Sequence, residues 1–318
     1  MKAFLNTAVL WAGSQDNLWE ISEHEMADAL QEIFDVVYPD VPYKVTINGS
    51  VFAIVSFASS FCIILSCAHN VLSLKTLQHL SEWRSNIGST ALAIVVDFCS
   101  RVKGVPEKDI AQALLEDFAF LYEDTDNRTR ETAYKSSFLQ QLIASAHLSA
   151  IIDHTDVPAL GTDELTKGKN TEGLIVLCVI AVSISFIDSF RCSTRLWQLE
   201  RALTFIRDDI INVDDVLASL ASGKFAVKLP KVLNKATGKE SSGQYQFSYQ
   251  NWRDQVEDYK SSIKTRTEDE IKDIIAFAWK AFKKNPANGS SAAESDAEVP
   301  ARKRALICMY FFLPVVRH

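Results

Sequence analysis

Two histidines and a carboxylate in one short stretch have the residue types for metal chemistry. His147 and His154 are seven positions apart, so a continuous helix would place them on one face, and Asp156 follows closely. Two imidazoles and a carboxylate form a ligand set that zinc and related metals accept. The same loose spacing is typical of a helix end where polar residues meet solvent, and we favour that interpretation. We therefore predict no metal site and no cofactor, with these three residues as the weak candidates.

A group of lysines has the chemistry to bind phosphate or nucleic acid. The five lysines are Lys224, Lys228, Lys231, Lys235 and Lys239. A strip of cations attracts a nucleic-acid backbone. However, few aromatic residues lie between these lysines, and Pro230 divides the strip, which favours a solvated basic loop.

Recognisable catalytic motifs are missing from the sequence. There is no G-x-S-x-G and no H-E-x-x-H, and Gly238-Lys239 lacks both the upstream glycine and the following Ser or Thr of a P-loop. We predict no catalytic residue, and a non-catalytic protein is favoured over an enzyme. An enzyme without a recognisable motif stays the third interpretation, for which His147, His154 and Asp156 would be tested first.

The elements that must position these residues are predicted to be helices. Among 318 residues there are 11 Gly and 8 Pro, which is few for a turn-rich β fold. Capping boxes at Ser22/Glu25 and Thr267/Glu270 mark two helix starts. Apolar residues recur at helical spacing in several segments. These stripes are Ala29, Leu30, Ile33, Phe34 and Val37; Trp83, Ile87, Ala91, Ile94, Val95 and Phe98; Ile110, Ala113, Leu114, Phe118 and Leu121; Phe138, Leu139, Leu142, Ile143 and Ala146; Trp252, Val256, Tyr259 and Ile263; and Ile271, Ile274, Ile275, Ala278 and Phe282.

The stripes predict one all-α domain of about seven to nine amphipathic helices over residues 1–284. The third stripe predicts a helix that starts at Pro106 and continues through Leu121. Residues 285–318 are predicted to be a linker and a tail, because 285–300 is rich in Ala, Ser, Asn and Glu.

The composition points to an intracellular protein, either cytoplasmic or nuclear. Its 33 Lys and Arg against 40 Asp and Glu give a net charge of −7, so the whole chain has no general attraction for nucleic acid or anionic membranes. None of its six cysteines forms a C-x-x-C pair, and most lie in apolar runs, which is typical of a reducing compartment. Secretion and membrane insertion are minority interpretations, the first because the N-terminus weakly resembles a signal peptide.

A long apolar run could be taken for a transmembrane segment. No charged side chain occurs in residues 51–74 when His69 is neutral, and the part from Val51 to Ala68 is the most apolar. Serines dilute the run, and no aromatic or basic belt flanks it. We therefore expect no membrane partner.

Five phrases of the sequence resemble an uncharacterised family that is abundant in mushroom-forming fungi. They are residues 80–86 (LSEWRSN), 120–124 (FLYED), 156–160 (DVPAL), 199–203 (LERAL) and 231–239 (KVLNKATGK). The resemblance extends from Glu25 to about Lys284. It implies a helical, intracellular domain of unknown function, and it implies no substrate and no functional residue.

Two segments depart from that resemblance as insertions, at residues 55–78 and 182–198. Each begins with Val-Ser and ends with Gln, and the codons of these residues can carry a splice donor and a splice acceptor. Translated introns are therefore favoured over loop insertions. The codons that the mature transcript retains decide between the two.

Taken together, the sequence predicts a non-catalytic helical module that binds another protein. The alternative is a nucleic-acid-associated protein that uses the lysines of residues 224–239, together with Arg302-Lys303-Arg304. Steep loss of DNA binding with rising salt would favour the alternative.

Overall fold

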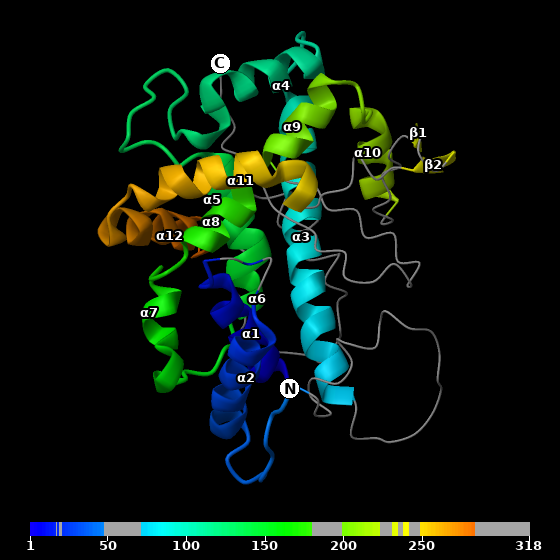
Figure 1. Ribbon diagram of the computed structural model, residues 1–318. Coiled ribbons are helices and arrows are strands. Elements are labelled where there is room, and N and C mark those ends of the chain that lie inside the picture. Colours follow the sequence, from blue (N-terminus) through cyan, green and yellow to red (C-terminus); the bar gives the residue numbers. More distant parts are fainter. Residues whose placement is uncertain are drawn as a thin grey trace.

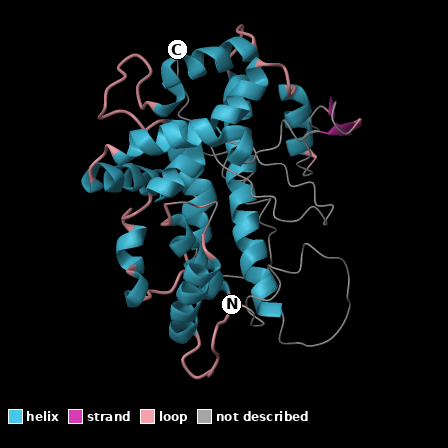
Figure 2. Ribbon diagram, in the orientation of Figure 1, coloured by secondary structure: helices cyan, strands magenta, loops and turns pink. Residues whose placement is uncertain are grey.

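A computed structural model of the chain describes residues 1–16, 18, 21–47, 71–179, 199–222, 231–234, 238–241 and 249–283 (Figure 1). Within these ranges the chain is mostly helical, which confirms the predicted all-α class (Figure 2). Eight of the described α-helices have nine or more residues. The other helical segments are shorter turns between them.

The first two helices pack together at the end of the molecule where the chain begins. Helix α1 (Lys2–Gly13) is the stretch that weakly resembles a signal peptide, and its Phe4, Val9 and Leu10 are buried in the core. Helix α2 (Glu23–Val37) begins at the predicted capping box, where Ser22 Oγ accepts from the Glu25 N–H and the Glu25 carboxylate accepts from the Ser22 N–H. The first box is thus confirmed.

Helix α3 (Val71–Arg101) is the longest element and runs through most of the length of the fold (Figure 1). Its predicted stripe is confirmed, with Trp83, Ile87, Ala91 and Val95 all buried. One part of α3 packs against α1, and other parts pack against α9 and α10. It is therefore the element that links the two ends of the core.

The helix predicted from Pro106 through Leu121 is wrong in its second half. Helix α4 (Glu107–Leu115) ends at Leu115, and a 3₁₀ segment, η2 (Glu116–Leu121), follows after a sharp change of direction. Pro106 caps α4, as expected for a proline at a helix start. Phe118, which the helical spacing placed on the buried face, is half exposed instead.

A helical stretch with an unusual middle turn follows the acidic loop, residues 123–127. Helix α5 (Ser137–Leu142) continues into a π-helical turn, η3 (Ile143–Leu148), and then into α6 (Ser149–Ile151). The predicted stripe from Phe138 to Ala146 is buried, which confirms it. A π turn contains one more residue per turn than its surroundings and is frequent at functional sites.

Shorter helices connect this stretch to the last helical pair. They are η4 (Pro158–Leu160), α7 (Thr162–Thr166), α8 (Glu172–Val179), α9 (Leu199–Arg207) and α10 (Val213–Ala221). Helix α9 packs closely along α4, and α8 packs against α11. All the residues of α8 from Gly173 to Val179 are buried, so this helix is central to the core.

The final described helices are α11 (Tyr249–Lys264) and α12 (Glu268–Lys283). The second predicted capping box is confirmed, because Thr267 Oγ1 accepts from the Glu270 N–H and Glu270 accepts from the Thr267 N–H. The complete predicted stripe of α12 is buried, against α5 and η3. Between α10 and α11 lies a small antiparallel hairpin of β1 (Val232–Asn234) and β2 (Lys239–Ser241), in which Val232 pairs with Ser241.

Several predictions fall outside the described ranges. These are the apolar run from Val51 to Ala68, the insertion at 182–198, most of the insertion at 55–78, and the tail at 285–318. Residues 71–78 of the first insertion form the beginning of α3. None of the helices within the described ranges combines the length and the apolar character that a bilayer crossing needs.

Candidate functional site

The three weak metal candidates lie in different surroundings. His147 is buried in the π turn, whereas His154 Nδ1 lies 2.9 Å from the Ile151 carbonyl oxygen. Asp156 accepts a 2.7 Å hydrogen bond from Thr162 Oγ1. No group of three His, Cys, Asp or Glu side chains suited to a metal ion occurs in the described ranges. The structure thus assigns each of the three residues a local contact of its own.

His147 sits in a tight apolar setting. It is 3% exposed, its ring centroid is 5.6 Å from that of Trp83, and neither His147 Nδ1 nor Trp83 Nε1 has a hydrogen-bond partner among the described residues. Gly13 at the end of α1 leaves room for the ring, because a Cβ there would lie 2.9 Å from His147 Cε1. Burial lowers the pKa of His147 to about 3, so the ring is neutral at physiological pH.

Only two of the five predicted lysines fall within the described ranges. Lys231 is exposed and directly precedes β1, and Lys239 begins β2, where it pairs with Asn234. Lys224, Lys228 and Lys235 lie outside these ranges. Part of the segment that the sequence predicted to be a basic loop is therefore a β-hairpin.

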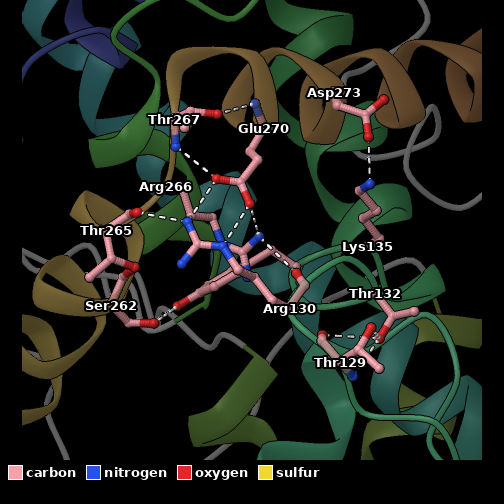
Figure 3. A network of polar contacts seen from close by, with 11 residues as sticks. Thr129, Arg130, Thr132, Lys135, Ser262, Thr265, Arg266, Thr267, Glu270 and Asp273 are labelled. Carbon is pink, nitrogen blue, oxygen red and sulfur yellow. Dashed lines mark hydrogen bonds and ion pairs between the residues drawn. The ribbon is translucent and has the colours of Figure 1, made fainter.

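A polar network joins the loop before α5 to the turn between α11 and α12 (Figure 3). Arg130 binds the Glu270 carboxylate through two 2.8 Å hydrogen bonds and also donates to the Thr265 carbonyl. Arg266 donates to the Arg130 carbonyl and lies 3.6 Å from the same carboxylate. We call Arg130, Arg266, Thr267 and Glu270 the clasp. Arg130 is the main cause that lowers the pKa of Glu270 to about 2.

Further contacts beside the clasp hold the same two segments together. The Tyr134 hydroxyl donates to Ser262 Oγ at 2.9 Å, and the Arg266 guanidinium lies over the Tyr134 ring. Lys135 forms an ion pair with Asp273 of α12. The loop from Tyr122 to Ser136 is thereby fixed on the α11–α12 turn.

The backbone kink after α4 is an unusual local geometry beside this loop. Asp117 (φ 49°, ψ 31°) and Phe118 (φ 57°, ψ 35°) are consecutive left-handed residues, a conformation that a bulky side chain rarely adopts. Phe118 is 50% exposed, and its ring meets the Tyr259 ring edge to face, with centroids 5.8 Å apart. The kink thus holds Phe118 partly exposed to solvent while its ring rests on Tyr259.

Two titratable side chains, Tyr259 and Glu200, are largely buried next to Phe118. Tyr259 is 6% exposed on α11, and burial, with a further contribution from the neighbouring Glu200, raises its pKa. Burial also raises the pKa of the Glu200 carboxyl group on α9. The Tyr259 hydroxyl and the Glu200 carboxyl group lie close enough for each to shift the pKa of the other.

A small depression of about 210 Å³ lies at the other end of α4. Its lining includes Glu107 and Lys108 from α4, Asp209 and Asn212 from the turn that leads into α10, and Val213 at the start of α10. The two carboxylates stand beside a single lysine, so the charges of the lining do not favour an anion.

Sequence reasoning did not identify either the clasp or the kink. The capping box already explained Glu270, and no local signal connects it to an arginine 140 positions earlier. Phe118 fitted the helical stripe, and no glycine marks the left-handed turn. The one available signal was the pair of acidic residues, Glu116 and Asp117, in front of Phe118.

Comparisons with known proteins find a family similarity for part of the chain. No curated protein and no solved structure matches this sequence. The pattern of the family described as "Domain of unknown function (DUF6532)" matches residues 23–150. This range contains α2, α3, α4, the kink, the acidic loop and the π turn. Residues 23–150 of this chain are thus similar to the DUF6532 domain, whose function is unknown.

Proposed function

We propose that this chain is a non-catalytic protein-interaction module whose contact surface centres on Phe118. The observation that carries the proposal is the kink, where two consecutive left-handed residues hold a half-exposed aromatic ring against α11. Non-glycine residues in this conformation cost about 1–3 kcal/mol each and persist where the surrounding structure imposes them. Such strain at a surface aromatic is more typical of a binding site than of a packing site.

The surroundings of Phe118 support a contact role. Aromatic residues dominate the energetic centres of protein interfaces, because they bury a large area with few rotatable bonds. The Tyr259 ring packs edge to face against the Phe118 ring. The clasp fixes the neighbouring loop on α12. A fixed aromatic side chain loses little conformational entropy when a partner binds.

The test compares two full-length variants in which the replaced residues are about equally exposed. In Phe118→Asn the new residue suits left-handed backbone, so the fold should keep its stability while the aromatic ring is lost. Ile152→Asn removes an apolar side chain of nearly equal exposure, 48%, from the end of α6. Crosslinking in cells followed by mass spectrometry should identify proteins that wild type and Ile152→Asn retain and that Phe118→Asn loses.

The result that contradicts the proposal is equally specific. If both variants fold and capture the same proteins as wild type in the same amounts, Phe118 is not a contact residue. Circular dichroism of both variants gives the necessary control for folding.

Nucleic-acid association is a second candidate, which the exposed Lys231 at the start of the hairpin supports. A salt titration of duplex DNA binding tests it with Lys231→Gln beside wild type. Each phosphate contact that is lost should lower the salt slope by about one unit. Absence of binding at low salt contradicts this second candidate.

We also propose a reducing compartment for the protein. Cys99 and Cys178 are buried free thiols in the described core, and burial raises the pKa of Cys99 to about 11. Alkylation under native and denaturing conditions, after extraction from cells, tests whether these thiols are free there.

A further inference from the structure

We propose that the partner presents a basic segment with an apolar anchor residue, which docks on Phe118 and its surrounding carboxylates. This inference rests on the proposed function and adds the chemistry of the partner. The charges around the kink are mostly negative.

Carboxylates flank Phe118 along the chain. Glu116 and Asp117 directly precede it and are exposed, and the Asp117 side chain is 86% exposed. The acidic loop then adds Glu123, Asp124 and Asp126, which are exposed as well. No lysine or arginine occurs from residue 116 to residue 127.

Tertiary contacts bring the acidic loop back to the kink. Arg128 donates a 3.1 Å hydrogen bond to the Glu116 carbonyl and lies 3.5 Å from the Asp117 carboxylate. The same side chain also donates to the Thr125 carbonyl inside the acidic loop. The loop and the kink therefore form one surface, in which Arg128 supplies one positive charge against five carboxylates.

The cations on the far side of the loop are already engaged. Arg130 and Arg266 bind Glu270, and Lys135 pairs with Asp273. These contacts direct their charge toward the carboxylates of Glu270 and Asp273 on α12 (Figure 3). Arg130, Arg266 and Lys135 therefore do little to neutralise the carboxylates around Phe118.

This combination of features selects one class of partner. Phosphate backbones and anionic lipid surfaces would be repelled by the carboxylates. A Lys- or Arg-rich segment gains from the carboxylates, and its cations can also lie over the Phe118 ring. An apolar side chain in the same segment would cover the exposed edge of the ring.

Selection from a random peptide library on the full-length protein is the direct test. Peptides that bind wild type are selected, and those that also bind Phe118→Asn are removed by counter-selection. The remaining peptides should be enriched in Lys and Arg around an aromatic or aliphatic residue. Ile152→Asn should bind the same peptides as wild type.

The tightest selected peptide then gives quantitative expectations. Phe118→Asn should weaken its binding by at least about 30-fold, the usual loss at an interface hot spot. Asp117→Asn together with Asp124→Asn should weaken it about tenfold, with a shallower dependence on salt. A duplex DNA of about 25 base pairs and vesicles with anionic lipids are measured in the same assay. Neither should bind wild type more strongly than it binds Phe118→Asn.

The possible outcomes separate the two proposals. If the Phe118-dependent peptides are acidic or uncharged, or if DNA or vesicles bind through Phe118, the partner chemistry is wrong while Phe118 stays a contact residue. If no peptide and no crosslinked protein depends on Phe118, the proposed function itself is wrong. Enrichment of basic peptides that lose affinity in the carboxylate variants supports both.

Discussion

The surroundings of His147 and the clasp treat polar side chains in opposite ways. Around His147, the Nδ1 atom and the neighbouring Trp83 Nε1 are buried without a described partner. In the clasp, by contrast, the Glu270 carboxylate accepts from Arg130 and from the Thr267 N–H while much of the network stays open to solvent. Close packing away from water holds the side chains around His147 in place. Hydrogen bonds and ion pairs hold the side chains of the clasp in place.

This difference teaches where each region should be sensitive. Unpartnered buried polar atoms cost free energy, so we expect His147 to tolerate replacement by an apolar group but not a change in the space around it. Exposed ion pairs contribute little individually, so the clasp should act mainly by fixing geometry.

The largest expected effect follows from closing the space beside His147. Gly13→Ala should lower the free energy of unfolding by about 2–3 kcal/mol, because its Cβ would lie too close to the imidazole. Chemical denaturation measures this change. In a His147→Ala background the same Gly13→Ala change should be neutral or stabilising, and equal costs in both backgrounds would contradict the close contact.

The second effect is a dependence of stability on pH. The folded-state pKa of His147, about 3, lies below its ordinary value of 6.5, so the unfolded chain binds the proton more readily. Stability should therefore fall as the pH drops below 6.5, by about 2 kcal/mol at pH 5. His147→Leu should lose about that much less than wild type between pH 7 and pH 5.

A spectroscopic measurement keeps the pH prediction testable if His147→Leu folds poorly. In wild type, the His147 ring resonances should not titrate between pH 5 and pH 8. A midpoint near 6.5 for this residue would show that the ring is accessible and would remove the contrast with the clasp.

The smallest effect concerns the clasp. Thr267→Ala should lower the free energy of unfolding by about 1 kcal/mol, because the start of α12 loses its cap. Thr267→Ser keeps the hydroxyl and is the matched control, with little expected change. Equal losses in both variants would mean that the methyl group, rather than the cap, stabilises this turn.

The sequence predicted what depends on near neighbours in the chain. Both capping boxes rest on residues three positions apart, and the stripe of α12 repeats over one helix. Helix period and capping chemistry are local, so they are readable before any tertiary contact is known. The all-α class followed from the sum of such segments.

The candidate surface was not predictable because its causes are distant in sequence. Phe118 continued the spacing of Ile110 and Leu114, yet the helix stops at Leu115 where α4 lies along α9 and Phe118 turns toward Tyr259. Tertiary contacts decided that choice, and no glycine announced it. The Arg130–Glu270 pair depends on the same long-range packing.

The length of α3 has a mechanical consequence. Its 31 residues form a rod of about 46 Å at 1.5 Å per residue, and it contacts α1 in one part and α10 in another. If such a rod pivots at one end, a tilt of about one degree moves the other end by roughly 0.8 Å. A slight change in packing at one end of α3 would thus become a larger displacement at the other end, which neighbouring side chains would have to follow.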